Sequence, residues 1–166
     1  MAIESIIDVL EQLQVAHEDM LVLGEQKKEA VVANKVETLI ALINQESKLA
    51  KRIELIEQQR LQEVHQFLEE RGIKSKLNLT ISELMRLVFD ASEKKRLLQA
   101  QTSLTDVLQK VKFLNEANQQ LIQQSLSYID FFIETMSFHS ESEATYQNPS
   151  EKPYGMARSG LFDTRA

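Results

Sequence analysis

The chain has 166 residues, no cysteine, no tryptophan and a formal net charge of −6. This acidic balance disfavours a general binder of nucleic acid or of anionic membranes, because phosphate groups would be repelled, and the lack of cysteine excludes disulfides and thiolate chemistry. With 43% apolar but only 6% aromatic residues, the composition favours slender helices around a thin core over a thick globular fold.

The first predicted helix covers about residues 3–33, and the second covers about residues 35–71. Apolar residues of the first recur at the three- and four-residue steps of an amphipathic helix. These residues are Ile3, Ile6, Leu10, Leu13 and Met20, and His17 falls at the same spacing. Asn34 and Glu37 have the spacing of a capping box, which predicts that the second helix starts there. Gly72 can adopt the left-handed conformation that ends it.

Two further helices are predicted after a loop at residues 73–79. Thr80 and Glu83 form a second capping box, which predicts a short helix over residues 81–90. A possible break at Asp90 precedes a long helix over about residues 92–138, which has a heptad-like seam. The seam residues are Leu97, Leu104, Leu108, Val111, Asn115, Asn118, Ile122, Ser125, Ile129, Phe132 and Met136, joined by Leu114, Leu121 and Tyr128.

These elements predict an all-α fold. Long helices joined by short turns run antiparallel, so we expect an elongated antiparallel bundle of three long helices with a short extra helix, over residues 1–139. Both prolines, Pro149 and Pro153, and two of the four glycines lie within residues 149–166. Because both residue types disfavour helix, residues 140–166 are predicted to form a flexible tail.

The N-terminal segment lacks the features of a secretory signal. Glu4, Asp8 and Glu11 precede the first basic residue, Lys27, so the positively charged start of a signal peptide is missing. The most apolar late stretch, SYIDFFIETMSF, contains two acidic residues and is too short to cross a bilayer. We therefore expect a soluble, cytoplasmic chain without stable membrane insertion.

The residues do not form a catalytic or metal-binding motif. The histidines, His17, His65 and His139, are far apart, and none belongs to an HExxH or Glu-x-x-His step, so neither a zinc hydrolase nor a di-iron bundle is supported. Glycine-rich phosphate loops and the GxSxG motif are also missing. We therefore expect that the protein is not an enzyme and uses no metal or other cofactor.

The C-terminal part of the last helix is the candidate binding surface. Asn115 and Asn118 are three residues apart and share a helix face. Two such amides can simply set the register of a helical seam, or they can lie beside a groove that receives a partner helix. Large apolar residues follow, in a number that one helical stripe cannot bury, so some are expected to face a ligand peptide or the tail. These residues are Tyr128, Phe131, Phe132, Met136 and Phe138.

Three segments resemble the FlgN-type flagellar export chaperones. They are VETLIALINQESKLAKRIELIEQQR in the second helix, LNEANQQLIQQSL in the last helix and KPYGMARSG in the tail. The resemblance implies a cytosolic chaperone of type III export that binds the C-terminal amphipathic segments of hook-associated proteins, which form the hook-filament junction. Such a chaperone would prevent premature assembly of these proteins and deliver them to the export gate.

The resemblance and the helix pattern together nominate two sets of site residues. The expected cargo-binding residues are Asn115, Asn118, Ile122, Tyr128, Phe131 and Phe132. The tail pair Tyr154 and Gly155 matches the Tyr-Gly pair that the family associates with docking to the platform protein of the export gate.

Two other classes of protein also fit these residues. One is a structural coiled-coil protein that self-associates and carries no client. The other is a regulatory helical adaptor, such as an anti-sigma factor. Light scattering separates the first from a chaperone, because a chaperone forms a small species whose mass rises by one cargo. A pull-down separates the second, because it would recover a transcription or signalling protein instead of a secreted one.

Overall fold

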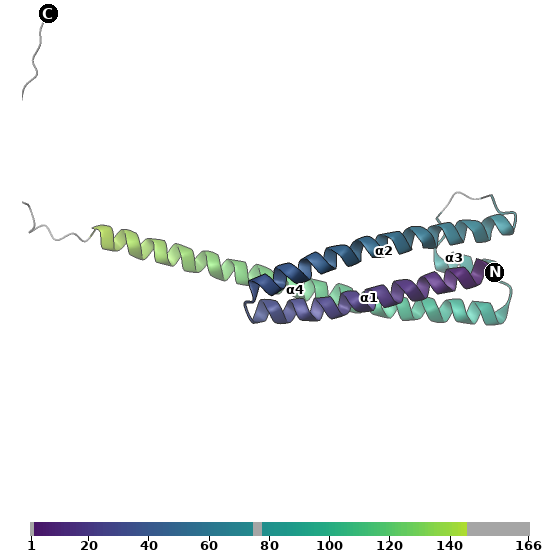
Figure 1. The fold of residues 1–166 in the computed structure, drawn as a ribbon, viewed down its shortest axis with the longest axis horizontal. Helices are drawn as coiled ribbons and strands as arrows, with labels where there is room; N and C mark the ends of the chain where they lie inside the picture. Colours follow the sequence, from purple (N-terminus) through teal and green to yellow (C-terminus); the bar gives the residue numbers. More distant parts are fainter. Residues whose placement is uncertain (1, 75–77, 146–166) are drawn as a thin grey trace, which may run out of the picture. The chain divides into compact units, whose positions relative to one another are not determined.

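The computed structural model of the chain describes residues 2–74 and 78–145 (Figure 1). Within these ranges the chain forms the helices α1 (Ala2–Val32), α2 (Val36–Glu70), α3 (Ile81–Leu87) and α4 (Ala91–Thr145). The described residues contain no strand. The all-α fold class predicted from the sequence is therefore confirmed.

The chain divides into two units, and the division falls inside α4. The first unit comprises Met1–Ser125 and contains α1, α2, α3 and the N-terminal part of α4. The second begins at Leu126, and the structure describes it as far as Thr145. The sequence predicts a boundary between the helical bundle and the tail at residues 139 and 140, and this boundary stays a prediction.

The core of the first unit combines side chains from all four of its helical segments. Ile6 of α1, Leu68 of α2, Leu84 of α3 and Leu97 of α4 belong to one cluster, and none is more than 1% exposed. Figure 1 shows α1, α2 and the first part of α4 side by side, with α3 at the end of the unit where the N-terminus lies. Burying one such side chain stabilises the fold by about 1.5–3 kcal/mol, so this cluster is the main attachment of α3 to the long helices.

The turn between α1 and α2 differs from the predicted capping box. The residue before α2 is Lys35, and no side-chain hydrogen bond caps the helix. Asn34 instead has a φ of 53°, and the amide of Lys35 donates to the carbonyl of Ala30 at 2.9 Å. This is the pattern in which a left-handed residue ends a helix. Asparagine suits it because its short polar side chain tolerates positive φ.

The end of α2 follows the chemistry that the sequence predicts. Gly72 has a φ of 70°, and the amide of Ile73 donates to the carbonyl of Leu68 at 2.9 Å. Leu68 is buried, and Ile73 packs against the same core cluster. The glycine therefore ends α2 while the apolar pair on either side of it joins the turn to the core.

The start of α3 is capped as predicted, and a side chain also caps the start of α4. The amide of Glu83 donates to the hydroxyl of Thr80 at 3.3 Å, and the Thr80 amide donates to the Glu83 carboxylate at 2.8 Å. The bond from the Thr80 backbone is the main reason that the pKa of Glu83 lies below its ordinary value. At α4, the Asp90 carboxylate accepts from the amide of Glu93 at 2.8 Å. Each cap satisfies a helix amide that has no carbonyl partner within the helix.

Candidate functional site

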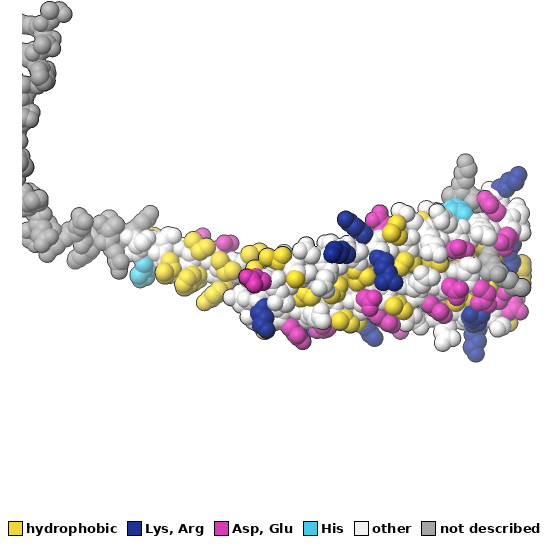
Figure 2. Space-filling view, in the orientation of Figure 1, with side chains coloured by type: hydrophobic (Ala, Val, Ile, Leu, Met, Phe, Trp, Pro, Cys, Tyr) yellow, Lys and Arg dark blue, Asp and Glu magenta, His cyan; other side chains and the backbone are white. Residues whose placement is uncertain are grey.

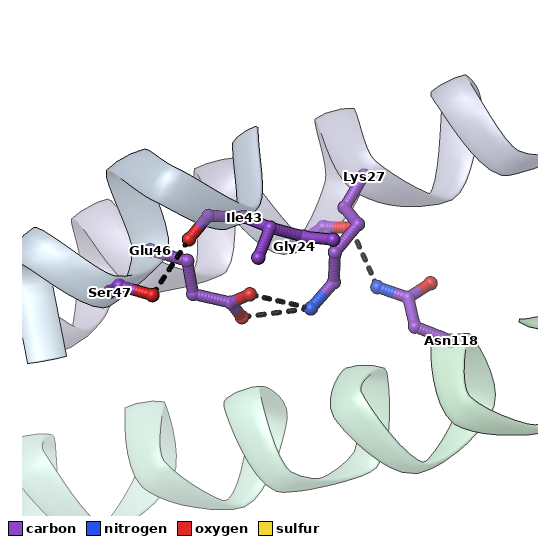
Figure 3. Close-up of polar contacts among 6 residues, drawn as sticks. All are labelled: Gly24, Lys27, Ile43, Glu46, Ser47 and Asn118. Carbon is purple, nitrogen blue, oxygen red and sulfur yellow. Dashed lines mark hydrogen bonds and ion pairs between the residues drawn. The ribbon is translucent and has the colours of Figure 1, made fainter. Parts of the chain in front are cut away.

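Asn118 is a buried polar side chain where α4 packs against α1. The residue is 1% exposed, and its Nδ2 donates to the carbonyl of Gly24 at 2.9 Å (Figure 3). Its Oδ1 is buried and has no hydrogen-bond partner among the described residues. Asn118 thus joins α4 to α1 through one hydrogen bond, while its unpaired buried acceptor lowers the stability of the fold.

Gly24 permits the close approach of α1 to α4. A Cβ atom at this position would lie 2.6 Å from Cδ2 of Leu114, and Leu114 is itself buried in the bundle. Any larger residue would have to displace the leucine side chain. The glycine thereby keeps its own carbonyl within reach of Asn118.

An ion pair between α1 and α2 lies beside Asn118 (Figure 3). The Nζ of Lys27 is 2.8 Å from both carboxylate oxygens of Glu46, and the two side chains are 13% and 23% exposed. A pair that is shielded to this extent is screened less by salt than a surface pair. Removing one partner would leave a poorly solvated charge at the wall of the site.

The ion pair and the amides surround one cavity of about 320 Å³. Three of the six predicted cargo-binding residues, Asn115, Asn118 and Ile122, lie in its wall. The complete lining is Lys27, Glu46, Asn115, Asn118, Gln119, Ile122 and Gln123. The wall therefore offers amide donors and acceptors together with an ion pair that the sequence pattern did not indicate, because its partners lie on different helices.

The buried side of α4 differs in part from the predicted seam. Leu108 and Asn115 are exposed, whereas their neighbours Val107 and Leu114 are buried. A straight helix has 3.6 residues per turn, so a strict heptad seam drifts away from the side that packs. Asn115 consequently lies at the rim of the cavity and Asn118 lies within the bundle.

The remaining cargo-binding candidates lie in the second unit. Tyr128, Phe131 and Phe132 are 70%, 66% and 54% exposed. Hydrophobic side chains gather on this part of α4 (Figure 2). The exposed large apolar residues there are Leu126, Tyr128, Ile129, Phe131, Phe132, Ile133, Met136 and Phe138. Tyr154 and Gly155, the predicted docking pair, lie outside the described residues.

Most of these exposed residues share one side of α4, which we call the apolar face. At about 100° per residue, its members are Leu126, Tyr128, Ile129, Phe132, Ile133 and Met136. The same helical phase places Leu97, Val111 and Asn118 toward the bundle, where they are buried. Phe131 and Phe138 fall on the opposite side of the helix. The apolar face is thus the continuation, in sequence phase, of the stripe that α4 buries in the first unit.

His17 is a partly buried imidazole through which we expect the stability of the first unit to depend on pH. Burial lowers its pKa below the ordinary 6.5, and the nearby Glu57 carboxylate opposes this only in part. The Nδ1 atom of His17 is buried and has no hydrogen-bond partner among the described residues. Protonation therefore favours the unfolded chain, in which the imidazole is hydrated.

We expect the free energy of unfolding to decrease as the pH falls from 6.5 toward the folded-state pKa of His17. Above 6.5 the imidazole is neutral in both states, so its contribution to stability is complete there. Urea unfolding at about pH 8 and about pH 5 should show a smaller pH dependence for His17→Gln than for the parent chain. An equal dependence in both proteins would show that other groups cause it.

Two properties of the described residues bear on the class of site. None of the described helices is long and apolar enough to cross a membrane. No three His, Asp or Glu side chains within residues 2–74 and 78–145 gather in a way that could hold a metal ion. The candidate binding features are two, each within its own unit: the amide-lined cavity of the first unit and the apolar face of the second.

Comparison with known proteins assigns the chain to a family. A family model described as FlgN protein matches residues 1–153. A relative from Bacillus subtilis (strain 168), described as the uncharacterized protein YvyG, is 33% identical over an alignment of 168 residues. The alignment covers 100% of this chain and 100% of the relative. No solved structure shows a significant match. The family resemblance predicted from the sequence is thereby confirmed, and the chain belongs to the FlgN family of flagellar export chaperones.

Proposed function

We propose that this chaperone binds the C-terminal amphipathic segments of hook-associated proteins in the cytoplasm, prevents their premature assembly and delivers them to the export gate. The observation that carries the proposal is the apolar face of α4. Its six large side chains are between 49% and 70% exposed. An apolar patch of this kind on a soluble protein usually marks a binding surface, and an amphipathic helix is the partner that suits a helical surface.

The chemistry of the cargo explains why such a surface would be useful. Junction proteins that polymerise through amphipathic terminal helices would self-associate if those helices were exposed before export. A chaperone that covers the apolar stripe removes the surface on which this assembly depends. Release then requires only a competing interaction at the export gate, so moderate affinity is sufficient.

In this proposal the cavity of the first unit supplies polar contacts for cargo. Asn115 is exposed at its rim, and Gln119 and Gln123 line its wall. Their amides can hydrogen-bond to backbone or side-chain groups of a bound peptide. Such contacts would fix the position of a helix that apolar contacts alone leave free to slide.

The tail provides a second contact in this proposal, through Tyr154 and Gly155. A chaperone that holds cargo on α4 while its tail binds the platform protein brings both to one place. The two contacts then reinforce each other through effective concentration. Delivery and protection are separate functions of separate segments.

Tyr154→Ala should leave cargo affinity nearly unchanged and weaken binding to the export-gate platform protein by about tenfold or more, because a tyrosine at a small interface contributes a large share of the binding energy. Titration calorimetry with the purified platform protein and, separately, with a cargo segment would measure both affinities. Tyr146→Ala, which replaces another tail tyrosine, is the matched control and should change neither. Equal losses of both affinities for Tyr154→Ala would contradict the separation of roles.

Light scattering tests the cargo-binding function itself. The chain should form a defined small species whose mass increases by one cargo when a C-terminal segment of a hook-associated protein is added. Self-association that grows with concentration, without any cargo uptake, would indicate a structural coiled-coil protein. A pull-down that recovers a transcription or signalling protein instead would indicate a regulatory adaptor.

A further inference from the structure

The segment that carries the apolar face is acidic throughout. Residues 113–151 contain six Asp or Glu residues and no Lys or Arg. The basic residues Lys112 and Lys152 mark the two ends of this stretch. Between Lys27 and Lys112, in contrast, Lys and Arg residues occur among the acidic ones.

Two of these acidic residues lie at one margin of the apolar face. Asp130 is four residues after Leu126 and three before Ile133, so it is their neighbour on the helix surface. Glu134 follows Asp130 by one further turn, and both carboxylates are exposed. No Lys or Arg occurs in the described part of the second unit to neutralise them.

We propose that the apolar face receives an amphipathic helix whose apolar stripe is flanked by Lys or Arg, and does not receive a second copy of this chain. The inference rests on the proposed function, because it names the chemistry of the cargo segment. Charges at the margin of a helix pair select the partner and its orientation. Asp130 and Glu134 require basic residues at the facing margin.

The helix-on-helix geometry follows from the continuity of α4. Its buried stripe in the first unit, including Leu97 and Val111, packs against other helices. The apolar face has the same phase and the same kinds of side chain, so an occupant that packs as a helix suits it.

A second copy of the chain does not satisfy the acidic margin. In an antiparallel pair, the margin that carries Asp130 and Glu134 would face the same margin of the other copy, which is a like-charge contact. In a parallel pair, Asp130 would lie beside an uncharged residue. Neither arrangement brings a Lys or Arg of this segment to the margin, because residues 113–151 contain none.

Two synthetic helical peptides with the same Leu and Ile stripe, one flanked by Lys and one by Glu, test the proposal against the full chain. Fluorescence anisotropy at low salt should give an affinity about tenfold or more higher for the Lys-flanked peptide. The difference should shrink to about twofold in about 0.5 M salt, because screening weakens contacts at an exposed margin.

Neutral variants locate the charge preference on the chain. Asp130→Asn combined with Glu134→Gln should abolish most of the preference for the Lys-flanked peptide. Asp106→Asn combined with Glu116→Gln removes the same number of exposed acidic charges from the first-unit part of α4. This control pair should retain the preference, which separates a local margin from the general attraction of an acidic protein for a basic peptide.

The possible results distinguish this proposal from the proposed function. Equal affinity for the two peptides, or a preference for the Glu-flanked one, would overturn the inference about charge. Either result would still support the proposed function, because the apolar face would still bind a helix. Binding of neither peptide would overturn both. A dimer that dissociates when the apolar face is made polar would identify a second copy as the occupant and overturn the inference.

Discussion

Replacing Ile129 and Phe132 together by serine should lower the affinity for a hook-associated cargo segment about a hundredfold or more. The reason is that burial of the two apolar side chains against the cargo should contribute about 3 kcal/mol or more to the binding free energy. In the free chain these side chains are 49% and 54% exposed. Their loss should therefore leave the helicity of α4 unchanged. Titration calorimetry with the cargo segment and far-ultraviolet circular dichroism of the free variant would measure the two properties.

A control on other parts of the same helix makes this test specific. Phe113 and Phe138 are 75% and 77% exposed, and both lie away from the apolar face. Phe113→Ser combined with Phe138→Ser should change cargo affinity by less than about threefold. An equal loss in both double variants would contradict a docking surface confined to the apolar face. A collapse of helicity in the first variant would instead show that Ile129 and Phe132 are core residues.

Phe131 allows a test of how far a bound cargo segment extends around α4. The sequence pattern places it among the cargo-binding residues, yet its helical phase is opposite to that of the apolar face. A single docked helix would not contact it, whereas a cargo segment that wraps around α4 would. Phe131→Ser alone therefore reports the width of the contact.

Leu97→Ala should destabilise the first unit by about 2–5 kcal/mol, the usual cost of removing a large side chain from a packed core. Leu97 is 0% exposed and belongs to the cluster that joins α1, α2, α3 and α4. Urea unfolding followed by circular dichroism should show a midpoint lower by about 1–2 M. The loss arises because neighbours on three other helices cannot close around the smaller side chain.

Leu98→Ala is the matched control for this prediction. The two leucines are adjacent in α4, but Leu98 is 50% exposed. The same substitution there should cost less than about 1 kcal/mol, because water already covers much of the side chain. Comparable midpoints for the two variants would show that this part of α4 is not packed as described.

Helix boundaries could be predicted where they depend on residues close together in sequence. Thr80 and Glu83 form their capping box within four residues, and Gly72 ends α2 through the conformational freedom of glycine. Asn34 was assigned wrongly because asparagine is suited to two roles, capping the start of a helix and ending one with positive φ. The local sequence does not distinguish these roles, whereas the path of the chain between α1 and α2 does.

Burial along α4 was predicted only in part. The apolar pattern correctly placed Leu97, Val111 and Asn118 on the packed side. It did not identify Val107, because a heptad template and a straight helix differ in phase over many turns. Which phase is buried depends on the helices that pack against α4, including the close approach at Gly24.

The amino-acid sequence by itself determined that the chain is all-α, where most of its helices begin and end, and which part of α4 carries an excess of large apolar residues. These properties depend on helix propensity, capping and periodicity, which act over a few neighbouring residues. Only the tertiary structure decided that Asn118 bonds to the Gly24 carbonyl, that Lys27 pairs with Glu46, and that Ile129 and Phe132 are exposed. The physical reason is that burial and polar pairing depend on which helix surfaces meet, and those surfaces belong to residues far apart in the chain.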